Sequence, residues 1–426
     1  MAGLALTLNT AEDCLLNTQT ELSTSSNNIA NANTAGYAVE TAAQTQDPSV
    51  WSTGGWIGTG ASITSISEAR NNFIEQQLMN ANTSDSYYTN LSSELTTVQA
   101  AASDSGSNGI SQALGNFFDS WSTLAQDPTG PAAQQSVYSA AQSLATAIQS
   151  TYSQLNQVAG QIPSQITDTV NQANTLIQQI QTLNQSILTT GQVSQPNSLI
   201  DQRYEAMDQL SQLIPVSFST ESNGSVDVST IESGASTNLV LGATSSTPIA
   251  SSSGITGGEL GGLLQAQTSL SGYMAQFDDF AQTLESQVNT ASGLTIFSGA
   301  GASSITANSS FLSGLSADSL SSLTQSMSSL QDSTSVTFTD GTTSSLQQYL
   351  SSIQDTIGSD VQSANNNQTY YDSLKTQLQN QQQSVSGVSL DQEMVDVIQY
   401  QQIYQAAAKV VETTSTLMNT AINMVP

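Results

Sequence analysis

The most regular hydrophobic pattern in the chain begins at Leu390 and runs to the C-terminus. Mostly apolar positions recur there at spacings of four and three residues, the heptad by which one helix packs a continuous seam against another. This C-terminal seam consists of Leu390, Met394, Val397, Gln401, Tyr404, Ala408, Val411, Ser415, Met418, Ile422 and Val425. A matching N-terminal seam consists of Leu4, Leu8, Ala11, Leu15, Thr18, Leu22, Ser25 and Ile29. Each helix is too polar to stand alone, so we expect the two ends to pair inside an assembly.

Helical periodicity also predicts the elements between these ends. The first helix is expected from about Gly3 to Ile29, and an Asn- and Gly-rich turn follows it. Further helices are expected at 71–102, 110–124, 132–188, 197–213, 260–291 and 345–383. Pro163 lies inside the longest of them and should kink it or split it into two consecutive helices. After a turn at 191–196, we expect Asn197 to cap the next helix.

Short alternating or apolar runs predict strands in the middle of the chain. They occur at 216–218, 226–228 and 239–241, separated by Asn-Gly and Ser-Gly turns. A Ser- and Gly-rich stretch at 294–338 is mixed in character and ends in a run of the same kind at 336–338. Between the first two helices, Ile63 and Ile66 indicate one more short strand.

These elements predict a mainly α chain with a smaller β-rich part, nested, elongated and divided into several domains. The terminal helices, 1–45 with 386–426, should form a coiled-coil assembly domain at one end. A long-helix bundle should follow in the middle, built from 46–215, 257–293 and 341–385. The remaining stretches, 216–256 and 294–340, are expected to form a small β-rich outer domain.

The charge balance excludes several classes of partner. The chain has 426 residues, with 33 Asp and Glu, 4 Lys and Arg and a net charge of −29. Nucleic-acid binding needs clustered basic residues, and the four here are scattered at Arg70, Arg203, Lys375 and Lys409. Anionic membrane surfaces are disfavoured for the same reason, and no window is apolar enough to span a bilayer. We therefore predict neither nucleic acid nor membrane as a partner.

The scarcity of basic residues also suggests an environment. Carboxyl groups with pKa values of about 4 lose their charge in strong acid, and this chain would then be nearly uncharged rather than strongly cationic. We therefore hypothesise an acid-facing extracellular setting, where a normal basic content would cause self-repulsion. The alternative is compositional drift in a Ser-, Thr- and Gln-rich surface protein.

The sequence predicts no catalytic, cofactor or metal site. It contains no histidine, the commonest general base and a frequent metal ligand, and its one cysteine, Cys14, excludes an intramolecular disulfide. The glycines of 257–262 lack a preceding phosphate-loop strand and are better explained as a flexible helix entry. Neighbouring carboxylates, such as Asp278 with Asp279, are more typical of a solvated helix face than of a glycosidase. The N-terminus has no basic region and is not expected to be a secretory signal.

Both termini resemble the axial subunits of the bacterial flagellar rod and hook. The N-terminal match lies in Asn27-Asn28-Ile29-Ala30-Asn31-Ala32-Asn33-Thr34-Ala35-Gly36-Tyr37. The C-terminal match begins at Ser386-Gly387-Val388-Ser389-Leu390-Asp391-Gln392-Glu393-Met394 and continues through Tyr400-Gln401-Gln402-Ile403-Tyr404. Asn28, Asn31, Asn33, Gly36 and Tyr37 carry the N-terminal family motif.

Three internal segments narrow the resemblance to the hook-associated protein 1 family, which joins hook and filament. They are Asn116-Phe117-Phe118-Asp119-Ser120-Trp121 with Leu124-Ala125-Gln126-Asp127-Pro128, then Ser198-Leu199-Ile200-Asp201-Gln202-Arg203-Tyr204, and Gly257-Gly258-Glu259-Leu260-Gly261-Gly262. Two features depart from the family. The outer portion is short, and Ala38-Val39-Glu40 stands where the family usually has Arg or Lys near Tyr37.

The resemblance implies a structural role without catalysis. It implies a self-assembling ring-like zone of a tube, contacts with the hook protein and the next hook-associated junction protein, and export through the flagellar type III apparatus with a chaperone. The protein would then be extracellular, in the flagellum. We expect assembly to rest on Leu4, Leu8, Leu15, Leu22, Ile29, Leu390, Met394, Val397, Tyr404 and Val411. The alternatives are another axial subunit of hook or distal rod, a secreted adhesin, or a wall-cutting glycosidase using Glu259 or Asp279.

Overall fold

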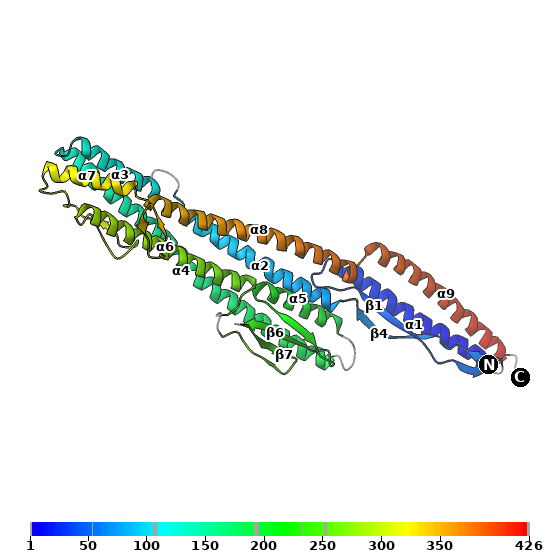
Figure 1. Cartoon of the computed structure of the whole chain (residues 1–426). Coiled ribbons are helices and arrows are strands. Elements are labelled where there is room, and N and C mark those ends of the chain that lie inside the picture. The colour runs from blue at the N-terminus through cyan, green and yellow to red at the C-terminus, as the bar shows by residue number, and fades with distance from the viewer. Residues whose placement is uncertain are drawn as a thin grey trace. The chain divides into compact units, whose positions relative to one another are not determined.

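The computed structural model describes residues 2–52, 54–104, 109–190, 196–232, 234–250 and 254–423. The chain is mainly α-helical, with small antiparallel sheets, as the sequence predicts (Figure 1). It divides into two compact units, each built from segments far apart in sequence. Unit 1 comprises Met1–Thr83, Gln172–Ile255 and Tyr371–Pro426, and unit 2 comprises Ser84–Asn171 and Thr256–Tyr370.

Unit 1 contains the two terminal helices, α1 (Ala2–Asn31) and α9 (Leu390–Asn423), and most of the strands. Its other complete helix is α5 (Asn197–Leu213). Three long helices, α2 (Asn72–Ala101), α4 (Pro131–Thr190) and α8 (Leu346–Ser386), each contribute one part to it. The strands form two hairpins and one four-stranded sheet of order β5-β6-β7-β8. Their bounds are β1 (Glu40–Gln46), β2 (Val50–Ser52), β3 (Gly55–Ile57), β4 (Ala61–Glu68), β5 (Ser217–Thr220), β6 (Val226–Glu232), β7 (Ala235–Leu241) and β8 (Ser245–Ser246).

Unit 2 is a helical body that holds the largest hydrophobic core. Its helices are α3 (Ile110–Gln126), α6 (Gly258–Ser292), α7 (Ala317–Gln331) and the remaining parts of α2 (Asn72–Ala101), α4 (Pro131–Thr190) and α8 (Leu346–Ser386). Two-residue strands pair as β9 (Phe297–Ser298) with β10 (Thr306–Ala307) and β11 (Val336–Thr337) with β12 (Thr343–Ser344). The core centres on fully buried aromatic side chains from three segments: Phe117, Trp121, Phe277, Phe280 and Phe297. Burial of each large side chain contributes about 1.5–3 kcal/mol, so this core is the main source of stability in unit 2.

The glycine-rich entry to α6 is explained by close packing. A Cβ atom at Gly262 would lie 2.5 Å from the backbone oxygen of Tyr87, and one at Gly261 would lie 2.7 Å from the carbonyl carbon of Thr256. Neither distance leaves room for a side chain, so α6 can approach α2 this closely only with glycine at these positions. These glycines are packed in place, contrary to the flexible helix entry that the sequence first suggested.

Most predicted helices are confirmed, with ends within a few residues of those expected. Of the two outcomes expected at Pro163, the split into two helices is not found. α4 is continuous over Pro131–Thr190, because one missing backbone hydrogen bond is outweighed by the packing of its neighbours Val158 and Ile162. The expectation for Asn197 was wrong. Asn197 does not cap α5: the capping position is Pro196, and the Asn197 amide instead donates to Glu40 Oε1 at 2.9 Å and to the Ile66 carbonyl at 3.3 Å.

The predicted strands at 216–218, 226–228, 239–241 and 336–338 are found, but their grouping differs from the expected outer domain. The structure places 216–255 in unit 1 and 294–340 in unit 2. The stretch 294–340 also contains a helix, α7, which the sequence analysis missed because serine dilutes its apolar positions. Leu320, Leu323, Met327 and Leu330 bury this helix in the core of unit 2, which holds the stretch there. Val425 of the C-terminal seam and most of the predicted turn at 191–196 lie outside the described residues.

Candidate functional site

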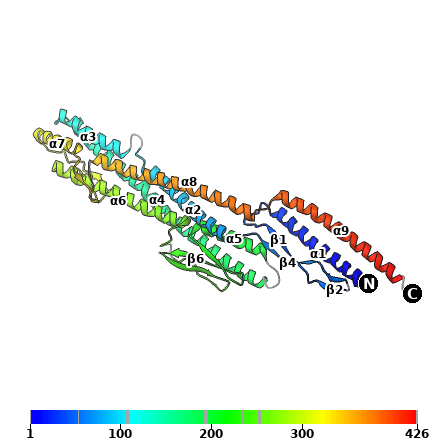
Figure 2. The same ribbon diagram turned by 45° about the vertical axis from the view of Figure 1, so that its right-hand side comes forward.

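The two ends of the chain pack together within one molecule. α1 lies alongside α9, and the hairpin of β1 with β4 lies next to α1 (Figures 1 and 2). The buried positions on α9 are Glu393, Ala407 and Thr414, which are fourteen and seven residues apart, with the half-buried Tyr400 at the intervening heptad position. Those on α1 include Ala11, Thr18 and Ser25, also spaced by seven. The contact between the helices is therefore a heptad seam of small and polar residues.

This geometry corrects the expected C-terminal seam. Glu393, Ala407 and Thr414 lie one residue away from Met394, Ala408 and Ser415, the positions predicted to face a partner helix. Leu390, Met394 and Tyr404 are instead exposed, at 46%, 57% and 43%. Val397 and Val411 are half-buried, as are the predicted α1 residues Leu4, Leu8, Leu15, Leu22 and Ile29. Small side chains and a buried hydrogen bond at Glu393 favour the observed register, although the other register holds larger apolar residues.

The large apolar side chains of α9 consequently face outward. They make up what we call the outer face of α9: Leu390, Met394, Val395, Ile398, Tyr404, Leu417 and Ile422. Each of these residues is at least 43% exposed. Single exposed apolar residues are ordinary, but an apolar series along one helix typically marks an interaction surface.

Asn28 of the N-terminal motif joins α1, β1 and α9. It is 1% exposed, and its side-chain amide donates to the Glu40 carbonyl at 3.0 Å and to Glu393 Oε1 at 2.9 Å. Its Oδ1 accepts from the Tyr37 hydroxyl at 2.7 Å and from the Glu40 amide at 2.9 Å. All four hydrogen-bonding valences of one asparagine side chain are thus used, which explains why the motif requires this residue type.

The rest of the motif shapes the turn after α1. The side-chain amide of Asn31 donates back to the carbonyl of Asn27 at 3.0 Å, while Asn33 is exposed. Gly36 has φ 75°, and a Cβ there would also lie 3.1 Å from the Cβ of Glu205. The motif residues therefore have local structural roles in unit 1. Asn28 links α1, β1 and α9, Asn31 stabilises the turn, and Gly36 allows the turn to approach α5 closely.

Arg70 is the residue at this junction that the sequence analysis did not single out. Its Nη2 donates to the Gly36 carbonyl at 2.8 Å and to Asp201 Oδ1 at 2.5 Å. Its other nitrogens contact Glu68 at 3.2 Å and Glu75 at 3.4 Å, and its guanidinium lies 4.2 Å from the centre of the Tyr204 ring. A cation near the tyrosine of the motif, which appeared to be missing at Ala38-Val39-Glu40, is thus supplied from the end of β4. In the sequence, the one sign of this role was a single arginine placed between two acidic residues, Glu68 and Glu75.

Burial around Arg70 alters the titration of its carboxylates. Desolvation raises the pKa of Glu68 to about 7 and that of Asp201 to about 6, even though Arg70 acts in the opposite direction on both. Glu40 and Glu68 are also direct cross-strand neighbours in the β1–β4 hairpin, and like charges there repel. Oε1 of Glu68 is buried without a hydrogen-bond partner. The junction is therefore a carboxyl-rich cluster held by one arginine.

The carboxylates considered for a glycosidase have structural partners. Glu259 Oε1 accepts from the Thr169 hydroxyl at 2.8 Å, and Asp279 accepts from the Thr339 amide at 3.0 Å and the Tyr349 hydroxyl at 3.1 Å. Both lie on α6, separated by twenty positions of sequence. Their partners hold elements of unit 2 together, and this arrangement does not pair them across a cleft.

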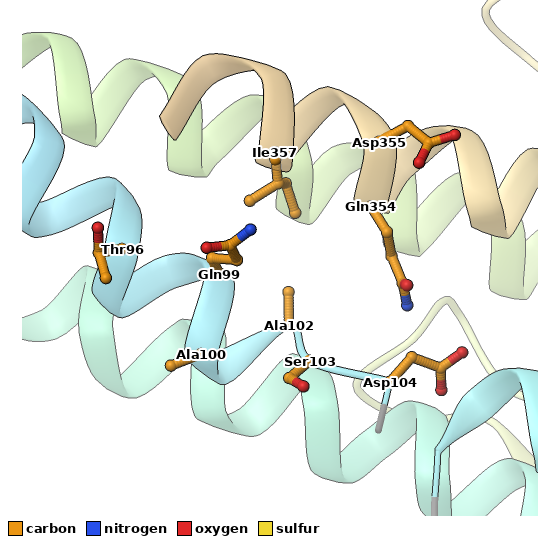
Figure 3. Close-up of a pocket in the computed structure, with 10 residues that line it drawn as sticks. Thr96, Gln99, Ala100, Ala102, Ser103, Asp104, Gln354, Asp355 and Ile357 are labelled. Carbon is orange, nitrogen blue, oxygen red and sulfur yellow. The ribbon is translucent and has the colours of Figure 1, made fainter. Parts of the chain in front are cut away.

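A large cavity of unit 2, about 810 Å³, lies between the end of α2 and α8. Figure 3 shows Thr96 and Gln99 on one side of it and Gln354 and Ile357 on the other. Asp104 at its edge already accepts from the Ser111 amide at 3.0 Å, at the start of α3. The lining combines amides, hydroxyls and carboxylates without a nucleophile–base pair, so nothing in it indicates catalysis.

Among the described residues, no group of three or more His, Cys, Asp and Glu side chains is placed to hold a metal ion. Within the same part of the chain, no helix combines the length and apolar character needed to cross a membrane.

Both ends of the chain match families of flagellar axial proteins. Residues 8–37 match the flagella basal body rod protein family, and residues 379–424 match the C-terminal region of the flagellar basal body rod FlgEFG proteins. These matches, together with the paired terminal helices, indicate the class of flagellar axial proteins. Residues 95–303 match the helical domain of the flagellar hook-associated protein FlgK. This match confirms the resemblance to flagellar hook-associated proteins that the motifs of the chain show.

Three similar proteins are each named flagellar hook-associated protein 1. The flagellar hook-associated protein 1 of Escherichia coli K12 is 26% identical over 240 residues, covering 56% of this chain and 43% of that protein. The Salmonella typhimurium protein is 34% identical over 123 residues, covering 29% of this chain and 22% of that protein. The Bacillus subtilis protein is 30% identical over 144 residues, covering 32% of this chain and 28% of that protein. The chain thus spans less than half the length of each.

A solved structure is also similar. The flagellar hook junction protein FlgK from Burkholderia pseudomallei has 29% sequence identity and a TM-score of 0.46, over 52% of this chain and 46% of that chain.

Proposed function

We propose that this protein is a structural subunit of the bacterial flagellum that forms the junction between hook and filament. It acts by self-assembly, with the hook protein and the next hook-associated junction protein as its neighbours. It reaches the flagellum through the flagellar export apparatus with a chaperone, and it has no catalytic activity. The match of residues 95–303 to the FlgK helical domain and the matches of both ends to flagellar axial families support this function.

The observation that carries the proposal is the outer face of α9. α1 already covers the opposite side of the helix, yet Leu390, Met394 and Tyr404 remain exposed. An apolar face left open after the ends of one chain have paired needs a further partner to remove it from water. In an axial subunit that partner is a neighbouring copy. The packing of α1 against α9 within one chain is supported by the half-buried residues Leu4, Leu8, Leu15, Leu22, Ile29, Val397 and Val411.

Deletion of the gene tests the junction role. We expect cells without the chain to make hooks that carry no attached filament and to release filament subunits into the medium. Expression of the intact chain should restore motility, and a gold-labelled antibody should mark the hook–filament boundary in electron micrographs. Labelling along the whole hook or filament would instead indicate another axial role.

A matched pair of variants tests the assembly surface. Met394→Glu places a charge on the outer face of α9, where assembly would bury it, whereas Gln379→Glu adds the same charge at an exposed position of α8. We expect the first variant to be folded and exported but poorly incorporated into flagella, and the second to assemble normally. Equal incorporation of the two variants would contradict a role for this face.

A further inference from the structure

The hairpin of β2 and β3 carries two largely exposed tryptophans. Trp51 pairs with Trp56 across the strands, and their rings meet edge to face with centroids 5.5 Å apart. Trp51 is nevertheless 66% exposed and Trp56 72% exposed. Their neighbours Val50 and Ile57 form the adjoining cross-strand pair and are also exposed, at 52% and 42%. Two adjacent exposed tryptophans are costly in water and are typical anchors of protein interfaces.

An apolar groove lies beside this hairpin, between α1 and α9. Its volume is about 480 Å³. Leu6, Ala11 and Cys14 line it from α1, and Ile403, Ala407 and Val410 line it from α9. Ile57 and Gly58 reach one end of the groove, so the hairpin emerges at its edge, near the N-terminal end of α1 (Figure 2). The groove is large enough for an aromatic side chain, and the hairpin's own tryptophans remain exposed outside it.

Charge identifies the occupant of the groove. The chain carries a net charge of −29, so two copies repel each other over most of their surfaces. Contacts between copies are least unfavourable where both surfaces are uncharged. Residues 48–64 of the hairpin region contain no charged side chain, and neither do residues 2–11 of α1 or 397–408 of α9. A basic partner would gain nothing from these neutral surfaces, whereas a second copy of this chain fits both.

We propose that the Trp51–Trp56 tip of one copy inserts into the groove between α1 and α9 of the next copy. This inference rests on the proposed function, since it names the contact by which subunits would join. Tip and groove are different surfaces of the same chain, so the contact is heterologous and leaves a free tip and a free groove at the ends of any row of copies. Repetition of the contact therefore generates a ring or a helix rather than a closed dimer.

Cys14 makes the contact accessible to cross-linking, because it is the chain's only cysteine and it lines the groove. In the bacterium that makes this chain, one copy keeps Cys14 while a second carries Cys14→Ser with Gly54→Cys. Gly54 is exposed at the tip with nothing near its Cβ position, and the change keeps both tryptophans. After mild oxidation of isolated flagella, we expect a disulfide between Cys14 of one copy and the cysteine introduced at position 54 of the other, identified by mass spectrometry of the linked peptides. Its matched control combines Cys14→Ser with Ser219→Cys, at an exposed position of β5, and should give no such link.

The tryptophans themselves are tested in the purified chain. The double variant Trp51→Ala with Trp56→Ala should weaken self-association roughly 30-fold in sedimentation equilibrium, the loss expected for an interface anchor. Its circular dichroism and thermal midpoint should stay unchanged because both rings are exposed. Phe73→Ala removes another exposed aromatic ring, 71% exposed and outside the hairpin, and should leave self-association unchanged.

The outcomes separate this inference from the proposed function. Flagella that contain both copies but give no 14–54 link, or as much link in the control, overturn the tip-and-groove contact alone. Equal self-association of the double variant and the Phe73→Ala variant also overturns it. A chain that never enters flagella overturns the proposed function, and the inference with it.

Discussion

The side-chain amide of Asn28 donates to the carboxylate of Glu393 at 2.9 Å, across 365 positions of sequence. Both residues are buried, at 1% and 7% exposure, in a contact between helices that otherwise contains small and polar groups. A buried hydrogen bond to a charged group contributes about 1.5–3 kcal/mol, which is large beside the modest apolar burial along this seam. The pairing of the chain's two ends thus depends strongly on one polar contact.

Replacement of Asn28 should loosen the terminal helices. In Asn28→Ala the Glu393 carboxylate, the Tyr37 hydroxyl and the Glu40 amide lose a partner, and we expect a loss of about 2 kcal/mol in the stability of the pair. Hydrogen exchange of residues 2–31 and 390–423 should accelerate, while the core of unit 2 keeps its protection. Asn33→Ala changes an exposed member of the same motif and should leave exchange unaltered. Equal effects of the two substitutions would refute the junction role of Asn28.

Arg70 should be among the most sensitive positions of unit 1. Arg70→Met retains much of the side-chain volume but leaves Glu68, Glu75 and Asp201 without their shared cation. Removal of one partner of a buried ion pair costs about 3–5 kcal/mol, and we expect a loss in that range in urea unfolding. Lys409→Met, in the exposed pair with Glu412, should change stability by less than about 0.5 kcal/mol. A small effect at Arg70 would contradict its role as the shared partner of these carboxylates.

Stability should rise as the pH falls from about 8 to about 5. Burial raises the pKa of Glu68 to about 7 and the pKa values of Asp201 and Asp208 to about 6, above their unfolded values of about 4. Between these limits the folded chain binds more protons than the unfolded chain, so the free energy of unfolding decreases as pH increases. Thermal unfolding across this range should show a higher midpoint at the acidic end.

The variant Glu68→Gln isolates one of these groups. It removes the charge that burial penalises, so the slope of stability against pH should become shallower, by on the order of 2 kcal/mol over the window. The neutral variant should gain most at pH 8 and least below about pH 3, where Glu68 is protonated in both states. A slope identical to that of the unaltered chain would show that Glu68 does not titrate in this window.

The glycine-rich entry to α6 offers a paired test in unit 2. Gly262→Ala forces a Cβ to within 2.5 Å of the Tyr87 carbonyl oxygen, and we expect a loss of about 2 kcal/mol as α2 and α6 move apart. Gly272→Ala lies in the same helix with nothing within 4 Å, and should stabilise it by about 0.5–1 kcal/mol through helix propensity. Opposite signs in thermal unfolding are the expected result. A stabilising Gly262→Ala would contradict the close packing.

The sequence predicted the helices because their apolar positions recur with helical spacing, as in α2 and α6. It did not predict how the two short stretches at 216–256 and 294–340 are distributed, because their grouping depends on tertiary contacts. Local pattern cannot report that Leu320 and Met327 of α7 fit the core of unit 2, while the strands before residue 255 belong to unit 1.

The candidate site was predicted in part, for similar reasons. The positions of the terminal helices follow from the heptad, but α9 carries two heptad registers one residue apart. Apolar content favoured the one with Met394. The structure selects the one with Glu393, because a specific hydrogen bond from Asn28 decides between them. Arg70 was missed because its importance lies in contacts with Gly36 and Asp201, which are distant in sequence.

The nested order of the two units has a consequence for timing. α1 meets its partner α9 only after all the segments of unit 2 have been synthesised, because residues 371–426 complete unit 1. At about 5–20 residues per second on the ribosome, the first helix waits tens of seconds for the last. During that interval unit 1 lacks the hydrogen bond between Asn28 and Glu393, and its N-terminal segment stays free of its native partner. Slow closure of this long loop would leave a period in which the proposed export route can receive the chain before it folds.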